Sequence, residues 1–114
     1  MIQKKYRLTA RGDFAHVFKG NIRSRSDPFS LVCRKNSRSF NRFGFVVSLA
    51  VSKKAVRRNK LRRQLHEIVR SLSSSLQPGY DCVIQAYPGA AELGFDEIKQ
   101  YVEEIFQKVG LYVD

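Results

Sequence analysis

Apolar residues recur at intervals of three and four in three parts of the chain, which is the spacing of one helix face. The longest part runs from about Lys54 to Leu76, and Gln77-Pro78-Gly79 ends it. Its apolar stripe consists of Leu61, Leu65, Ile68 and Leu72. Residues 9–19 carry a shorter version, and a third stripe lies between residues 98 and 109. The pattern therefore predicts three helices.

Three other segments are apolar, β-branched or aromatic, as strands are. Residues 22–35 are interrupted by Pro28, which predicts two short strands or one bent edge strand. Residues 42–51 form an apolar run that we expect to be the most buried strand, and residues 80–87 form a short one. The order α-β-β-β-α-β-α predicts an α+β protein, a two-layer α/β sandwich with helices on a mixed four-stranded sheet. At 114 residues, we expect a single domain spanning 1–114.

The distribution of charge along the chain indicates a class of function. The net charge is +11, but residues 1–70 contain 19 Lys or Arg and 3 acids, whereas residues 71–114 contain 2 and 7. This asymmetry predicts one face that meets a polyanion and another that faces solvent. No apolar run approaches the roughly 18 residues of a membrane span, so we expect a cytoplasmic protein with no membrane partner.

The densest basic segment is residues 53–63, KKAVRRNKLRR, which holds seven cations and no acid. Like charges four residues apart repel on a helix, and a phosphate backbone would relieve that repulsion. At about 100° per residue, Asn59, Arg62, Arg63, His66 and Arg70 fall opposite the apolar stripe. The run therefore favours RNA binding over the alternative, an ordinary solvated helix face.

Catalytic chemistry by the protein itself has little support. His16 and His66 are the two histidines, and nothing in their spacing brings them together. The acids form no metal-binding cluster, and those of the last helix are typical of a solvated face. Cys33 and Cys82 lie in apolar runs without a C-x-x-C spacing, which favours buried free thiols over a disulfide or metal pair.

Three phenylalanines have two possible roles. Phe14, Phe18 and Phe29 could stack unpaired bases, at about 1–3 kcal/mol each. On periodicity alone core packing is the favoured role, because a small domain needs its large apolar residues in the core.

Four ordered segments resemble the bacterial ribonuclease P protein component. The run VRRNKLRRQL resembles its R-N-x-x-[KR]-R signature, and residues 7–21, RLTARGDFAHVFKGN, resemble its first helix. Residues 42–48, RFGFVVS, are similar to its central strand, and residues 86–93, AYPGAAEL, to the loop before its last helix. The resemblance spans nearly the whole chain.

The resemblance implies the protein subunit of ribonuclease P. Such a protein binds a catalytic RNA, which with Mg²⁺ ions held mainly by the RNA and substrate removes the 5′ leader of precursor tRNA. The implied partners are the catalytic RNA and precursor tRNA, and not DNA. The resemblance implies no catalytic or metal-binding residue in the protein. It also implies a left-handed β-α-β crossover, against the usual right-handed rule. The implied RNA-binding residues are Lys54, Arg57, Arg58, Asn59, Lys60, Arg62, Arg63 and His66. The implied leader groove, between first helix and sheet, contains Phe14, Phe18 and Phe29.

Some positions depart from the family pattern. Val32 stands where relatives often have an aromatic groove floor, and His66 where Arg is frequent, which would make that contact depend on pH. Leu49-Ala50 replace a usual Lys pair, and Lys53-Lys54 come later. Two other classes compete: a non-catalytic RNA-binding protein, such as a ribosomal protein of similar two-layer fold, and a stand-alone nuclease. The first helix and the PGAAEL loop favour the ribonuclease P subunit.

Overall fold

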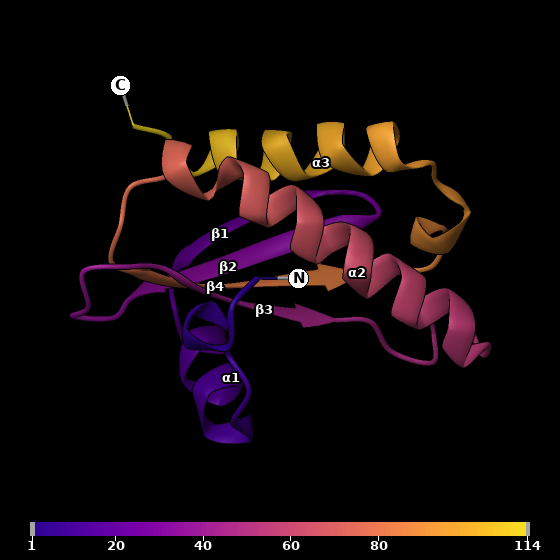
Figure 1. Cartoon of the computed structure of the whole chain (residues 1–114), viewed down its shortest axis with the longest axis horizontal. Coiled ribbons are helices and arrows are strands. Elements are labelled where there is room, and N and C mark those ends of the chain that lie inside the picture. The colour runs from indigo at the N-terminus through magenta and orange to yellow at the C-terminus, as the bar shows by residue number, and fades with distance from the viewer. Residues whose placement is uncertain (1, 114) are drawn as a thin grey trace.

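The computed structural model describes residues 2–113 and contains a four-stranded sheet and three α-helices (Figure 1). The regular elements, in chain order, are α1 (Arg11–Phe18), β1 (Ile22–Ser26), β2 (Phe29–Lys35), β3 (Arg42–Val46), α2 (Ala55–Leu72), β4 (Tyr80–Ala86) and α3 (Phe95–Lys108). Short 3₁₀ turns lie at Lys4–Tyr6, Ser73–Ser75 and Ala90–Glu92. The predicted element order is confirmed, and the segment around Pro28 forms two strands.

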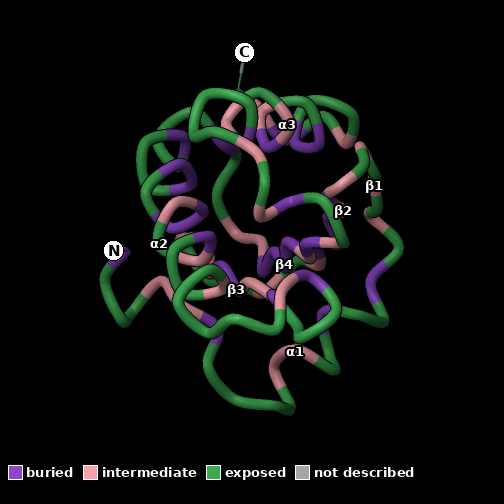
Figure 2. The backbone as a smooth tube through the Cα atoms, turned by 90° about the vertical axis from the view of Figure 1, so that its right-hand side faces the viewer, coloured by how far each residue is buried: buried purple, intermediate pink, exposed green. Residues whose placement is uncertain are grey.

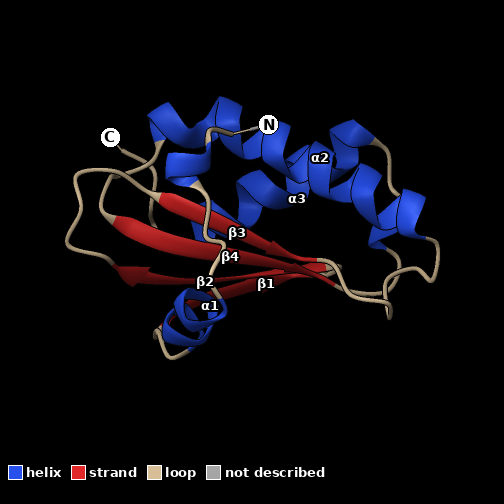
Figure 3. Ribbon diagram, turned by 60° about the horizontal axis from the view of Figure 1, so that its bottom comes forward, coloured by secondary structure: helices blue, strands red, loops and turns tan. Residues whose placement is uncertain are grey.

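The sheet has the strand order β1-β2-β4-β3. β1 pairs with β2, and β2 with β4, in antiparallel fashion, whereas β3 and β4 are parallel. Parallel neighbours need a crossover, and α2 supplies it. In Figures 1 and 3 this β3-α2-β4 connection is left-handed, so the expected mixed sheet with its unusual crossover is confirmed.

The helices divide between the two faces of the sheet. Figure 3 shows α2 and α3 together on one face and the shorter α1 on the other. In Figure 2 the buried parts of α2 and α3 are those turned toward the sheet. We call the face under α2 and α3 the inner face and the face that carries α1 the outer face.

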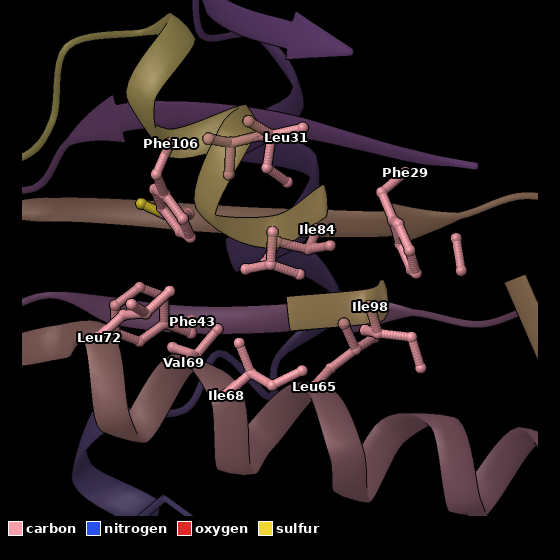
Figure 4. Close-up of a cluster of buried hydrophobic side chains, with 14 of the residues drawn as sticks. Phe29, Leu31, Phe43, Leu65, Ile68, Val69, Leu72, Ile84, Ile98 and Phe106 are labelled. Atoms are coloured by element: carbon pink, nitrogen blue, oxygen red, sulfur yellow. The ribbon is translucent and has the colours of Figure 1, made fainter. Parts of the chain in front are cut away.

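The main core lies between the inner face and the two long helices (Figure 4). The α2 stripe of Leu61, Leu65, Ile68 and Leu72 is buried there, as the periodicity predicts. From the sheet side, β2 and β4 contribute alternate residues such as Leu31 and Ile84. Burial of these side chains is the dominant stabilising contribution.

The segment from residue 42 to residue 51 is not the most buried strand, and that expectation is wrong. β3 ends at Val46 and lies at the edge of the sheet. The most buried strand is β4, which pairs on both sides and has five of its seven residues buried. An apolar run alone does not distinguish an edge strand from a central one, because β3 is covered by α2 and by the amino-terminal segment.

Phe29 lies on the inner face, which contradicts its assignment to a groove. Its side chain is fully buried, and its ring centroid lies 6.1 Å from that of Tyr101 of α3. Side chains alternate along a strand, so Ser30 and Val32 face outward where Phe29 and Leu31 face inward. The assigned strand is correct, but Phe29 is a core residue.

α1 rests on the outer face through a close contact with β3. A Cβ atom on Gly44 would lie 2.6 Å from the ring of Phe14, so the ring occupies the space that a side chain would take. Val17, one turn further on, is fully buried in a small cluster with Leu8, Val32 and Val83. This second core holds α1 against one part of the outer face.

Cys33 and Cys82 are directly paired residues on β2 and β4. Both are buried free thiols, as expected, with their sulfur atoms 3.1 Å apart. Burial raises the pKa of the Cys82 thiol well above its ordinary value, so this thiol is kept protonated.

Truncation of Phe29 tests the division between the two faces. Phe29→Ala should lower the free energy of unfolding by about 3–5 kcal/mol, because it opens a cavity in the main core. Phe18→Ala, the matched control on α1, should cost less than roughly 2 kcal/mol, because Phe18 is already 37% exposed. Urea denaturation measures both values, and equal losses would contradict the placement.

Candidate nucleic-acid interface

A groove runs between the end of α1 and the uncovered part of the outer face. Its volume is about 400 Å³. Val32 and Val83 form an apolar floor, and Phe18 and Tyr87 stand among its lining residues. The departure from the family pattern at Val32 is thus on the groove floor, where this side chain is 4% exposed.

Two arginines of β1 border this groove. Arg23 donates hydrogen bonds to the carbonyl oxygens of Gly20 and Phe18, which fixes it beside the end of α1. The guanidinium carbon of Arg25 lies 4.0 Å from the ring centroid of Tyr87, and Arg25 also forms an ion pair with Asp27. Single-stranded nucleic acid binds to sites that combine cations for its phosphates with aromatic rings on which its bases stack.

Neutral polar groups also line the groove. The hydroxyls of Ser30 and Tyr87 are 3.0 Å apart and share a hydrogen bond, and Gln85 lines the groove beside them. A hydroxyl and an amide can donate to and accept from base edges, whereas the apolar floor offers only contact area. The groove therefore offers cations, ring faces and neutral hydrogen-bonding groups together.

A buried ion pair fixes the other end of the outer face. Arg42 donates from Nε and Nη2 to the two carboxylate oxygens of Asp81, at 2.9 and 2.7 Å. Asn36 donates to the same carboxylate at 2.8 Å. Burial alone would raise the pKa of Asp81, but these hydrogen bonds lower it overall and keep it ionised. The pair joins β3, β4 and the β2–β3 loop, with Asp13 of α1 3.9 Å from Arg42.

The two phenylalanines of α1 have different surroundings. Phe18 lines the groove and is exposed, whereas Phe14 is half-buried against Gly44. Of the three expected groove residues, Phe18 is thus brought to the groove, Phe14 supports α1 beside it and Phe29 lies on the other face. We therefore keep Phe18 as the candidate for base stacking.

Apart from His66, the expected RNA-binding residues on α2 and at its start form two groups. Lys54, Asn59, Lys60 and Arg63 are exposed, as the sequence predicts. Arg57 is also exposed but lies 3.5 Å from the carboxylate of Glu92. These side chains can meet a phosphate backbone without rearrangement of the fold.

Arg58 and Arg62 are partly used inside the protein. Arg58 donates to the carbonyl oxygen of Ser52 at 2.9 Å, and Arg62 donates to that of Val47 at the same distance. Arg62 also donates to Asn59 Oδ1. Both therefore tie α2 to the loop after β3, although each keeps guanidinium donors for an external anion.

His66 does not face outward, so the expected pH-dependent RNA contact at this position is wrong. It is 7% exposed, and its ring centroid lies 4.6 Å from that of Phe45. Burial and the nearby charge of Arg7 lower the pKa of His66 from 6.5 to about 4, so it is neutral near pH 7. On the helix, residue 66 lies about 100° from the buried Leu65. Its side chain is therefore still in the region where α2 meets the edge of the sheet.

His66 and His16 lie on helices that cover opposite faces of the sheet, so they form no catalytic pair. Within residues 2–113, no group of three or more His, Cys, Asp or Glu side chains is placed to hold a metal ion. In the same part of the chain, no helix has the length and apolar character needed to cross a membrane.

Among the groove residues that sequence reasoning missed are Arg23, Arg25, Gln85 and Tyr87. A signal for two of them existed, because β1 reads Ile-Arg-Ser-Arg-Ser and its alternation places both arginines on one face. Gln85 and Tyr87 had no local signal, because they join the groove only through the pairing of β4 with β2.

The family model for ribonuclease P matches residues 2–110. The ribonuclease P protein component of Cyanothece sp. is 34% identical, with 97% of each chain covered. That of Caldanaerobacter subterraneus subsp. tengcongensis is 32% identical over 98% of this chain and 96% of its own.

Solved structures show the same fold. The RNase P protein of Thermotoga maritima has a TM-score of 0.80 at 29% identity, covering 90% of this chain and 96% of that one. The RNase P protein of Staphylococcus aureus has a TM-score of 0.86 at 23% identity, covering 95% and 98%.

Fold and site together define a basic α+β protein with an open, cationic sheet face, an arrangement suited to polyanions. By the family match over residues 2–110 and by its relatives, the chain belongs to the ribonuclease P protein family. Membership places it in a tRNA-processing endoribonuclease complex and implies association with the RNase P RNA.

The buried histidine leads to a prediction about acid stability. Since the folded pKa of His66 is about 4 and the unfolded value is 6.5, the unfolded state binds more protons between these values. The free energy of unfolding should therefore fall as the pH is lowered from 6.5 to 4, by roughly 1–3 kcal/mol from this residue. His66→Gln should remove that part of the pH dependence in urea denaturation.

His16→Gln is the matched control, because His16 is exposed on α1. It should leave the pH dependence as it is in the parent protein. If His66→Gln also kept the pH dependence of the parent protein, the imidazole of His66 would take up a proton in the folded state as readily as in the unfolded state.

Proposed function

We propose that the chain is an RNA-binding subunit of ribonuclease P that holds the 5′ leader of precursor tRNA in the α1 groove. The observation that supports the proposal is the groove of about 400 Å³. Its lining includes the exposed ring of Phe18, Arg23 and Arg25 around an apolar floor. Aromatic stacking with adjacent cations suits unpaired nucleotides, and a leader is single-stranded. Membership in a family of tRNA-processing proteins supports a precursor tRNA, which carries such a leader, as the substrate of the complex.

The exposed cations of α2 would bind the catalytic RNA. Lys54, Lys60 and Arg63 project from a helix that is anchored by its leucine stripe. Arg58 and Arg62 would share their charge between the β3–α2 loop and the RNA, so they would also hold the helix in place. In this arrangement the leader and the catalytic RNA meet opposite faces of one sheet.

Mg²⁺ would be held mainly by the RNA and the substrate. The donor set of the described residues lacks a cluster of three carboxylate, imidazole or thiolate groups, and the proposed interfaces are cationic. A metal ion in the complex would supply activated water and stabilise phosphate charge. The protein would position the leader and neutralise phosphates.

A reconstitution experiment tests the function. The purified chain is combined with a bacterial ribonuclease P RNA and a precursor tRNA at low Mg²⁺, and release of the 5′ leader is measured. We expect cleavage to increase when the protein is added to the RNA, and no cleavage by protein alone. Absence of stimulation over a range of Mg²⁺ concentrations would refute the proposal.

The salt dependence of RNA binding tests α2. Arg63→Ala should flatten the slope of log K against log salt by about 1 unit, because one phosphate contact is lost. Its stability should change by less than about 0.5 kcal/mol, since Arg63 is exposed. Arg62→Ala should in addition lower the free energy of unfolding by about 1 kcal/mol, because the carbonyl oxygen of Val47 loses its hydrogen-bond donor. An unchanged slope for Arg63→Ala would show that this side chain is only solvated.

Leader recognition can be separated from tRNA recognition at Phe18. Phe18→Ala should weaken binding of precursor tRNA to the reconstituted complex by roughly 1–3 kcal/mol and leave mature tRNA binding unchanged. Val17→Ala is the control from the same helix, because Val17 is fully buried and should lose stability instead. Equal loss of both tRNAs in Phe18→Ala would argue against stacking on the leader.

A further inference from the structure

A further cavity lies outside both surfaces described so far. Its volume is about 610 Å³. The walls come from the amino-terminal segment, the β2–β3 loop, the end of α2 and the turn that follows it. It is therefore at the opposite end of α2 from the basic run, and Arg70 lies there, about 18 Å along the helix from Arg58.

Two aromatic rings form part of its wall. Tyr6 and Phe40 pack edge to face, with ring centroids 5.4 Å apart and an angle of 82° between the planes. Both side chains are half-buried, so ring surface is left open toward the cavity. A small domain usually buries such rings in its core, and here two are kept at the surface.

The wall is held in place by hydrogen bonds that leave the rings free. The buried Asn41 accepts from the backbone of Tyr80 at 2.7 Å and donates to the carbonyl of Gln77 at 2.9 Å, which fixes the loop that carries Phe40. The amide of Leu8 donates to the carbonyl of Phe43 at 2.8 Å, which fixes the segment that carries Tyr6. The cavity is thus pre-formed.

Two cations lie beside these rings, next to the residues that line the cavity. The ammonium of Lys5 lies 4.8 Å from the ring centroid of Phe40 and 5.4 Å from that of Tyr6, and the guanidinium of Arg38 lies 5.8 Å from Phe40. Within residues 2–113 neither cation forms a salt bridge. Arg70 pairs with Glu67 at 3.1 Å, and among residues 2–113 no carboxylate lines the cavity.

We propose that this cavity binds one unpaired nucleotide of RNA, with its base against Tyr6 and Phe40 and its phosphate near Lys5 and Arg38. The volume lies within the ordinary range for small-ligand sites, and rings with unpaired cations match a base attached to a phosphate. The serine hydroxyls at the end of α2, Ser73 and Ser74, offer hydrogen bonds to ribose or base edges. The inference rests on the proposed role in RNA binding and extends that surface along the whole of α2.

Photo-crosslinking tests the proposal directly. The full chain is irradiated with an unstructured RNA pentamer containing 4-thiouridine, and the crosslinked peptides are identified by mass spectrometry. We expect crosslinks at Tyr6 or Phe40 that persist in Phe18→Ala, which weakens the α1 groove. Crosslinks confined to the α1 groove would overturn the cavity assignment while leaving the proposed function intact.

Charge variants give an independent measurement. Lys5→Gln should weaken pentamer binding to the Phe18→Ala background by about threefold or more, because one phosphate partner is lost. Lys99→Gln, which removes the same charge from α3, should change it by less than about twofold. Lys5 is exposed, so its substitution should not disturb folding. Equal effects of the two lysine variants would overturn the assignment.

A last comparison separates this inference from the proposed function and from another ligand class. If hexaglutamate displaces the pentamer from the cavity as well as RNA does, the site is a general anion site and the nucleotide assignment fails. If Lys5→Gln lowers pentamer binding but the parent protein does not stimulate cleavage by the RNA, the cavity assignment stands and the proposed function fails. The two outcomes are therefore distinguishable.

Discussion

The alternation of side chains along β2 and β4 is the constraint on which the rest of the structure depends. Both strands are central, so each residue faces either the core under α2 and α3 or the outer face. The inner face takes Phe29, Leu31 and Ile84, and the same register turns Ser30, Val32 and Gln85 outward. Since a one-residue slip would exchange the two sets, formation of the core also forms the groove.

The outer face is accessible to a ligand because it is only partly covered. α1 has eight residues, and it is seated by the contact of Phe14 with Gly44 and by the burial of Val17. A longer helix, or a second one, would cover the remaining strands. The short helix instead leaves an apolar floor beside Phe18, bordered by the arginines of β1. The proposed leader site is thus the part of the sheet that this chain does not cover with itself.

The helices were the most predictable part of the fold, because Leu61, Leu65 and Ile68 repeat a pattern that one helix reveals by itself. The assignments of Phe29 and His66 could not be settled in this way. For Phe29 the strand pattern fixes alternation but not which face a given set occupies, and His66 sits at the margin of its helix stripe, where Phe45 of another element decides its exposure. Arg58 and Arg62 show the same limit, because the carbonyls they bind belong to a loop whose path the basic pattern does not encode. Arg25 and Tyr87 are 62 positions apart in the sequence, and the pairing of the strands brings them together.

The uneven distribution of charge has a consequence for kinetics. Asp96, Glu97 and Glu104 are exposed on α3, on the inner side of the sheet, whereas Arg23 and Arg25 border the groove on the outer side. Because the exposed cations of α2 also lie on the inner side, the excess of negative charge is confined to α3, and the chain is an electric dipole directed away from that helix. A dipole in the field of a polyanion experiences a torque before any contact forms, and this torque turns the acidic helix away from the RNA. Productive encounters would then outnumber those expected from random collision, and lower ionic strength would widen the range over which this orientation acts.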